Sequence, residues 1–595
     1  MHPTSMSRMR LYAPFLALVA FQALLVALLP STSGSDQASF ADGPTPTVDG
    51  TAHAGSTGTG DTDGADLAAL DTAEGAGAGA GGSTPTTGAT GQGGGTTEGA
   101  SGESGSGGGE TDGSEGTNDG GVAAAGDTGH CTEDGRQHGV TFHAPSCRPV
   151  FEGDNGGSTY AGVTGDEITV VWFTVQTNEQ LEAISDAAGS ENTVEGFLEY
   201  LEAIEEFINT HYETYGRSVN IEYFEADCPD TPQDVPACRA EARRMMNELD
   251  PFAVVWSTPL YPEIFDEFAR EGVLSLGGWH FENQFFEGRR PFRWDLNMDG
   301  TQAGELIAEY YCTKLAGETA SHAGQVIHPS IGPRDTTERR LGILTPETEA
   351  NVSAANHVRR LVSECSGQDE IPLATYESNI ERAQEQSTAN AATMINGGVT
   401  TMVCMCDPIA PIFTTRTYTA QGYFPEHLLA GIGFMDVDQI GRLYDSEQWA
   451  HAFGLSHIAE QPPAEESDYQ AVWEASGRDG DAPGSWALAT SYLLTLAGMV
   501  HNAGPNLTPA TIEEGMFSAE ATGGWQATGG DASVVKVDFG PSNYTAISDV
   551  REVYWDASAI SQSDGEPGAY VPMNDGRRYV SGEIPAGLDV PQPAR

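Results

Sequence analysis

Two cysteines, Cys404 and Cys406, stand one residue apart in the stretch GVTTMVCMCDPIAPIF, and Asp407 and Pro408 follow them directly. Thiols at this spacing could bind a metal ion, take part in a redox reaction or form a disulfide. A metal site needs further ligands, and neither a histidine nor a second cysteine pair stands nearby in the sequence. Because side chains two residues apart on a strand share one face, a bond between these cysteines is awkward. Two structural outcomes stay open, a strained disulfide and two buried thiols.

Three motifs of one kind end predicted strands: WSTP (256–259), LTPE (344–347) and CDP (406–408). In each, a hydroxyl or carboxylate side chain can accept the orphan amide bonds of a following helix, and proline suits the first helical turn. The remaining amides and the helix dipole could then face a polar or anionic ligand group. The alternative is capping alone, as in LTPA (507–510), which opens a late helix after a turn.

The elements that position these motifs alternate between short β-branched runs and amphipathic helical stretches, which predicts parallel strands with helical crossovers. This alternation of strands and helices occurs in two successive halves of the sequence. The first half has predicted strands at 168–175, 218–227, 252–257 and 273–278, and the second at 339–345, 371–377, 400–405 and 427–434. We expect an α/β fold with two doubly wound lobes, with ligands at the carboxyl ends of the strands.

The last quarter of the chain contains the apolar stretch 485–504, a capped helix at 507–518 and predicted strands at 533–539 and 550–557. A late pair of helices after two complete α/β halves suggests that the chain returns to the first lobe. We expect lobe 1 at 129–297 with 458–525, lobe 2 at 298–457 with 526–595, and a hinge made of several chain crossings.

The N-terminal region predicts export. Residues 11–29 are uncharged and apolar and follow two arginines, which is the pattern of a signal peptide or membrane anchor at 1–30. Residues 31–128 are rich in Gly, Ser, Thr and Asp and cannot bury enough apolar area to fold, so we expect a flexible tether. The predicted location is extracellular or at the cell surface, with membrane contact only through the N-terminal segment. Whether that segment is cleaved stays open.

All eight cysteines lie between residues 131 and 406, and an even number in an exported chain favours disulfides over zinc or catalytic thiols. Two pairs are close in sequence, and two further cysteines end consecutive predicted helices. We expect the disulfides Cys131–Cys147, Cys228–Cys238, Cys312–Cys365 and, by default, Cys404–Cys406.

The net charge of −59, from 86 acidic and 27 basic residues, argues against nucleic acid as a partner and fits a solvated acidic surface. The sequence contains no Gly-x-Ser-x-Gly, His-Glu-x-x-His or phosphate-loop motif, and its histidines are scattered. We therefore expect neither enzymatic activity nor a cofactor or metal.

Three stretches resemble a known family: AGVTGDEITVV (161–171), the Cys-x-Cys block leading to YDSEQWAHAFG (444–454), and GAYVPMNDGRRYVSGEIP (568–585). They are similar to type I solute-binding proteins of ABC importers, of the branched-chain amino acid and amide type and its exported actinobacterial branch. The resemblance spans roughly residues 161–585. It implies a monomeric two-lobed clamp that closes over a small solute and delivers it to a membrane permease.

The resemblance also implies site residues. Ser257 and Thr258 match a serine that holds the ligand carboxylate, whereas Gly278 and Trp279 replace a hydroxyl-bearing loop. The indole suggests a larger or flatter ligand that stacks on the ring, although Trp279 could equally be a packing residue. On the second lobe, the expected ligand-binding residues are Thr345, Glu347, Asp407 and Phe434, with the two carboxylates holding a cationic group.

A tethered extracellular sensor or surface protein on the same fold is the alternative function. The solute itself is not predicted, beyond a small polar molecule such as an amino acid or amide.

Overall fold

The structure is a computed structural model that describes residue 137 and residues 140–176, 192–229, 235–255, 262–277, 281–588 and 590–591. These residues all belong to one compact unit, Glu115–Arg595. The predicted signal segment, the predicted tether and Cys131 lie outside the described residues. In the part of the chain that is described, no helix combines the length and the apolar character needed to cross a membrane.

The first sheet is parallel and, within the described ranges, has five strands in the order β2-β1-β3-β4-β5. Strand β1, which has a neighbour on each side, is an almost continuous apolar run with both faces buried, as expected for a parallel sheet covered by helices. The strands are β1 (Glu167–Gln176), β2 (Ser218–Pro229), β3 (Ala253–Val255), β4 (Leu274–Leu276) and β5 (Arg293–Trp294).

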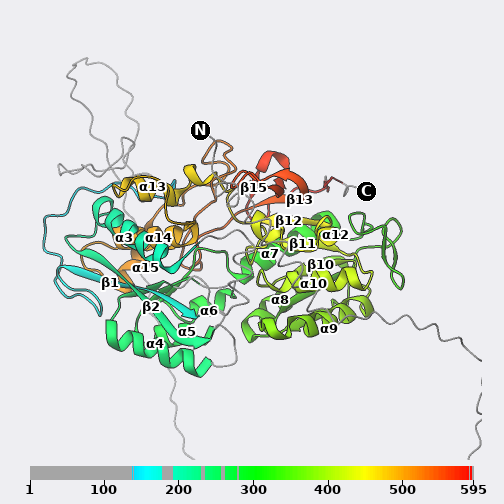
Figure 1. The fold of residues 1–595 in the computed structure, drawn as a ribbon, viewed down its shortest axis with the longest axis horizontal. Coiled ribbons are helices and arrows are strands. Elements are labelled where there is room, and N and C mark those ends of the chain that lie inside the picture. Colours follow the sequence, from blue (N-terminus) through cyan, green and yellow to red (C-terminus); the bar gives the residue numbers. More distant parts are fainter. Residues whose placement is uncertain are drawn as a thin grey trace, which may run out of the picture. The chain divides into compact units, whose positions relative to one another are not determined.

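Helices cover both faces of this sheet. Figure 1 shows α4 and α5 on one side of β1 and β2, and α3, α14 and α15 on the other. The helices are α3 (Val194–His211), α4 (Val235–Leu249), α5 (Pro262–Glu271), α6 (Asn283–Glu287), α13 (Asp468–Ala475), α14 (Ala487–Ala503) and α15 (Pro509–Ser518). The apolar side chains of α14 lie in the same core as β1, so the predicted return of the chain to the first half is confirmed.

The second sheet has the order β14-β13-β12-β11-β10-β8-β9 along its main path, and β15 pairs with β13. Its parallel part, β9-β8-β10-β11-β12, repeats the order of the first sheet, whereas the pairs made by β13 are antiparallel. The strands are β8 (Leu341–Pro346), β9 (Leu373–Tyr376), β10 (Thr401–Cys404), β11 (Glu426–Ala430), β12 (Ala452–Ser456), β13 (Val550–Ile560), β14 (Pro567–Pro572) and β15 (Arg578–Tyr579), with a separate hairpin of β6 (Val326–His328) and β7 (Gly332–Pro333).

Side chains along β10 alternate between two cores. Val403 and Met405 pack with α7 and α8, whereas Met402, Cys404 and Cys406 pack on the other face with α9 and α10. The helices are α7 (Gly300–Tyr310), extended by the π-helix η2 (Tyr311–Leu315), α8 (Glu349–Ser366), α9 (Ala383–Asn396), α10 (Ala410–Ala420), α11 (Asp438–Gly441) and α12 (Ser446–Trp449), with 3-10 turns η3 (Ile380–Arg382), η4 (Ala464–Glu466) and η5 (Asn574–Gly576).

The chain passes between the two halves three times among the described residues. The first core contains residues up to Trp294 and again from Tyr469 to Ala546. The other two cores together contain residues from Met298 to Leu455 and then from Val550 onward. The prediction of two doubly wound halves joined by several crossings is therefore confirmed. The division into moving lobes at 129–297 with 458–525, and 298–457 with 526–595, stays a prediction.

The strand predicted at 533–539 is wrong. Val537 makes only isolated bridges, to Thr522 and Ile547, and the backbone N–H of Lys536 donates to the carboxylate of Asp549 at 2.9 Å. Phe539 packs in the first core. This β-branched segment is therefore extended chain that packs against the first half, before the last crossing, and not a strand of a sheet.

Three disulfides join described cysteines, and each was expected: Cys228–Cys238, Cys312–Cys365 and Cys404–Cys406. The pair Cys131–Cys147 stays a prediction. The Cα atoms of Cys404 and Cys406 are 5.0 Å apart, whereas two residues of extended strand would span about 6.6 Å. The chain therefore leaves the extended conformation at the end of β10, which makes the bond possible.

Candidate functional site

The carboxyl ends of β8, β9, β10, β11 and β12 meet at one edge of the second sheet, because these strands are parallel neighbours. Ligands of doubly wound sheets bind at such an edge. The residues that follow these strand ends include Glu347, Ser378, Asp407, Phe434, Asp436 and His457. We call this group the edge site.

Asp407 is held firmly in the edge site. Its Oδ1 accepts the backbone N–H groups of Ile409 and Ala410, both at 2.9 Å, and its Oδ2 accepts the hydroxyls of Tyr376 at 2.6 Å and Ser378 at 3.5 Å. Burial and the Asp407 charge raise the pKa of Tyr376 well above its ordinary value, so the phenol stays a donor. Asp407 therefore caps the start of α10 and positions the end of β9, and direct contact with a ligand stays a prediction.

Thr345 and Glu347 stand on either side of Pro346 and have opposite surroundings. Thr345 is 0% exposed, and its hydroxyl donates to the carbonyl of Met405 at 3.2 Å. This bond ties β8 to the turn after β10. Glu347 donates its backbone N–H to the carbonyl of Tyr376 at 2.8 Å, while its side chain is exposed. Of the two, Glu347 has the side chain that a solute can reach.

Phe434 and Asp436 follow β11. Phe434 has a φ of 54°, a left-handed conformation that non-glycine residues adopt rarely and often at functional positions. Its ring lies 6.4 Å from that of His457. Asp436 is a buried carboxylate that the sequence analysis missed, because it stands in a short loop without periodic pattern. Its place just after a strand end was the available signal.

The loops after β1, β3 and β4 of the first sheet lie outside the described residues, and Ser257, Thr258, Gly278 and Trp279 fall within them. Their ligand-binding role stays a prediction. One described contact does join the two edges: the hydroxyl of Ser353, in the first turns of α8, donates to Glu282 Oε1 at 2.7 Å. Glu282 precedes α6, shortly after β4. Segments that follow strand ends of both sheets therefore touch.

A buried polar network links the three chain crossings. The Tyr492 hydroxyl donates to Asp295 Oδ1 at 3.0 Å, and Asn297 Nδ2 donates to that hydroxyl at 3.2 Å. Asn297 Oδ1 lies 3.2 Å from His457 Nε2, and Arg578 donates to the His457 carbonyl at 2.7 Å. Arg578 also donates to Asp549 Oδ1 at 3.0 Å, in the third crossing, so each crossing is linked to another by hydrogen bonds.

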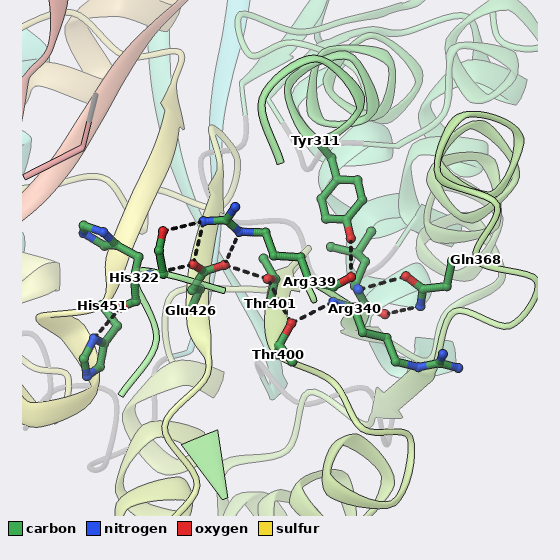
Figure 2. Close-up of polar contacts among 11 residues, drawn as sticks. Tyr311, His322, Arg339, Arg340, Gln368, Thr400, Thr401, Glu426 and His451 are labelled. Carbon is green, nitrogen blue, oxygen red and sulfur yellow. Dashed lines mark hydrogen bonds and ion pairs between the residues drawn. The ribbon is translucent and has the colours of Figure 1, made fainter. Parts of the chain in front are cut away.

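A second polar cluster lies at the opposite, amino edge of the second sheet (Figure 2). Glu426 Oε2 and Oε1 accept Arg339 Nε and Nη2, each at 2.9 Å. The same carboxylate accepts the Thr401 hydroxyl at 2.7 Å and the His322 backbone N–H at 2.9 Å. Its acceptor capacity is used within the protein, and its carboxylate is fully buried. The cluster therefore fixes the starts of β10 and β11 rather than binding a ligand.

Histidines near this cluster are neutral. Burial lowers the pKa of His322 to about 3 and that of His427 to about 4, and it also lowers the pKa of His451, whose Nδ1 lies 2.7 Å from the His322 carbonyl. Within the described ranges, no group of three or more His, Cys, Asp or Glu side chains is arranged to hold a metal ion.

No protein-family model matches the chain, and no curated protein matches it. Among solved structures, it is similar to the substrate-binding protein of an ABC transporter from Aeropyrum pernix. That structure has 13% sequence identity and a TM-score of 0.47, and the match covers 70% of this chain and 97% of that one.

A structure of a branched-chain amino acid ABC transporter from Thermus thermophilus with bound valine is similar at 11% identity and a TM-score of 0.45, over 70% of this chain and 97% of that one. A solute-binding protein from R. palustris in complex with 4-hydroxybenzoate has 11% identity and a TM-score of 0.47, over 70% and 98%. The class of protein that the sequence resembles is thus also found among structures similar to this chain.

Proposed function

We propose that the chain is the solute-binding component of an ABC-type importer, which captures a small polar solute between two lobes and presents it to a membrane permease. The observation that supports this most is the architecture: two sheets whose parallel parts have the same strand order, linked by three crossings, and whose carboxyl-edge segments meet at the Ser353–Glu282 hydrogen bond. Ligands of such sheets bind at these ends.

Binding by hinge closure follows from this arrangement. A solute that contacts both lobes at once stabilises the closed form, in proportion to the difference in its affinity for the two forms. The network of Asp295, Asn297, Tyr492 and His457 is the place where the crossings change together. No bond of the solute is broken in this cycle, so the function needs no catalytic group.

Carboxylates predominate among the described charged side chains of the edge site, which include Glu347, Asp407 and Asp436. Carboxylates form charge-assisted hydrogen bonds with ammonium, amidine and amide groups. We therefore infer a solute with a positively charged or hydrogen-bond-donating group, such as an amino acid or amide. Trp279 would supply a flat apolar surface on the other lobe.

In this proposal the protein is exported and works outside the cytoplasmic membrane. Residues 11–29 hold it near the membrane. Its partner is the membrane-spanning permease of the importer. A disulfide-bonded fold fits this location, because disulfides persist in oxidising compartments.

A thermal-shift screen of amino acids, amides, ureas and polyamines against the full-length chain tests the proposal. A solute at 100 times its dissociation constant stabilises the folded protein by about 2.7 kcal/mol. The double variant Trp279→Ala with Asp407→Asn should lose this stabilisation. The matched control is Arg244→Gln, on the exposed face of α4, which should keep it. If the double variant binds a solute with parental affinity, the edge site is wrong.

A further inference from the structure

A hollow of about 210 Å³ lies at the carboxyl ends of β11 and β12, and none of Thr345, Glu347, Asp407 and Phe434 lines it. Its walls come from the start of α11, from the crossing that follows β12, and from the β13–β14 hairpin. The polar lining includes Asp438, Glu460, Arg551 and Gln562. Asp438 and Glu460 lie 91 or more residues before Arg551 and Gln562 in the sequence, so the fold brings the two pairs together.

Arg551 is the unusual group in this hollow. It is only 5% exposed, and its side chain makes no hydrogen bond with any described residue; Nε and Nη1 are buried without an acceptor. Its ion pair with Glu460 spans 3.7 Å from Nη1 to Oε2, which is too long for a hydrogen bond. Buried guanidinium groups in native proteins almost always have acceptors, and a carboxylate is the acceptor that matches them best.

The carboxylates of Asp438 and Glu460, which line the hollow, each accept one hydrogen bond. Asp438 Oδ1 accepts the backbone N–H of Tyr570 at 2.8 Å, and Glu460 Oε1 accepts Gln562 Nε2 at 2.7 Å. Asp436 also lines the hollow. Three carboxylates and one guanidinium leave an excess of negative charge, which opposes a simple anion. A simple cation is repelled by the positive charge of Arg551. A molecule that carries both charges can pair with the guanidinium and with the carboxylates.

We propose that this hollow binds a small zwitterion, an α-amino acid or a betaine, with its carboxylate on Arg551 and its cationic group facing Asp438 and Glu460. Apolar wall residues, Val437, Ile458 and Val571, would contact the rest of the molecule. The hollow adjoins the edge site of the proposed function and shares Asp436 with it, but Glu347, Asp407 and Phe434 do not line it.

The hollow lies beside a crossing between the two halves, so a zwitterion bound there would act on the hinge. One wall is Ile458–Gln461, which belongs to the second crossing between the halves of the molecule. His457, the preceding residue, is part of the polar network of the crossings. Binding here would therefore bias the hinge and change the affinity of the edge site.

Isothermal titration calorimetry on the full-length chain tests the proposal with four probes of matched size. Glycine betaine and L-alanine carry both charges, choline carries the cation alone, and propionate carries the carboxylate alone. The zwitterions should bind at least about tenfold more tightly than choline and propionate, since each single-charge probe leaves either the guanidinium or the carboxylates of the site unpaired.

Arg551→Met keeps the apolar stem and removes the guanidinium, so zwitterion affinity should fall by at least about tenfold. Arg340→Met is the matched control, because Arg340 donates to the Glu370 carbonyl at the far edge of the sheet and should leave affinity unchanged. If the Arg551 variant fails to fold, Glu460→Gln serves instead, since the Glu460 side chain is 30% exposed and tolerates replacement. It should also weaken zwitterion binding about tenfold.

Three results would overturn the proposal: no zwitterion binds, choline binds as tightly as betaine, or both variants bind like the parent chain. The proposed function fails by a different result. A zwitterion whose binding is abolished by the Trp279→Ala and Asp407→Asn double variant but unaffected by Arg551→Met occupies the edge site, so the importer function would stand and this hollow would be excluded.

Discussion

Replacing Glu426 by glutamine should destabilise the second half of the molecule without altering solute binding. Glu426 is 0% exposed and the Arg339 side chain 2%, so Glu426→Gln leaves a guanidinium buried without its counter-charge. Removing one partner of a buried pair costs about 3 to 5 kcal/mol. We expect the lower end, about 3 kcal/mol, because glutamine keeps one oxygen, which still accepts from either the Thr401 hydroxyl or the His322 backbone N–H.

Urea unfolding followed by circular dichroism measures this loss. With a slope of about 3 kcal/mol per molar urea, the midpoint should fall by about 1 M. The control, Glu248→Gln, breaks an exposed pair with Arg244, whose side chains are 55% and 43% exposed, and should cost less than about 0.5 kcal/mol. Adding Arg339→Met to Glu426→Gln should recover part of the loss, because no uncompensated charge then stays buried.

The reasoning is refuted if Glu426→Gln unfolds at the same urea concentration as the control, or if the double variant is less stable than the single one. A fall in solute affinity measured on the folded variant would show instead that the cluster of Figure 2 takes part in binding.

Three further predictions address pH, cross-links and charge. The pKa values of His322, His427 and His457 are lowered to about 3, about 4 and about 4, so the unfolded chain binds more protons below pH ~6.5 and stability falls as the pH drops. Between pH 7 and 5 the loss is on the order of 6 kcal/mol, and Asp299 and Asp468, whose pKa values are both raised to about 6, offset roughly 3 kcal/mol of it; urea midpoints in ~1 M salt, which screens the surface charge, should decline over this range, and a flat profile contradicts it. Replacing Cys312 and Cys365 by serine should cost about 4 kcal/mol, against about 1.5 for Cys404 and Cys406, because the sequence separations are 53 and 2; equal midpoints for the two double variants would contradict the loop-entropy argument. Glu347→Gln should weaken binding of a cationic solute mainly at low salt, since this exposed carboxylate acts through a screened charge; a loss that is independent of salt would place Glu347 in direct, desolvated contact.

The strands that form the sheets were predictable because burial on both faces leaves an unmistakable apolar run. β1 was expected at 168–175 and occupies Glu167–Gln176, and β8 was expected at 339–345 and occupies Leu341–Pro346. β12, AFGLS, was missed, because five residues beginning just after a short helix carry too little pattern. Tertiary contacts decide such cases.

The helix boundaries show the same limit. The helical pattern of residues 193–216 extends beyond α3, which ends at His211, because Tyr212 adopts an extended conformation and its backbone N–H still bonds back to Ile208. A short turn with left-handed Tyr215 then leads into β2. Aromatic and polar side chains packed from elsewhere, such as His501 against Glu213, hold this turn. A local pattern does not contain such a partner.

Residues at strand ends were predictable as a class, but their individual roles were not. Asp407 was recognised from the strand–carboxylate–proline sequence, yet the partner that fixes it, Tyr376, stands 31 residues away. Arg551 carried no signal in the sequence, because its ion-pair partner, Glu460, lies 91 residues earlier. Spacing identifies which edge can bind, whereas long-range contacts decide which side chains are left for a ligand.

The same edge chemistry therefore performs two tasks in this fold. A carboxylate that caps a helix and holds a neighbouring tyrosine, as Asp407 does, has its lone pairs occupied before a solute arrives. It contributes rigidity, which lowers the ordering cost of binding. An exposed carboxylate such as Glu347 contributes charge, which is weakened by salt. Selectivity for a solute must then come from buried side chains that lack some of their hydrogen-bond partners. A solute that fails to pair with them binds more weakly, because it leaves a buried polar group without a hydrogen bond. Arg551 meets that condition among the described residues that line the hollow, and for this reason the hollow beside the second crossing is the place where charge pattern, rather than rigidity, selects a ligand.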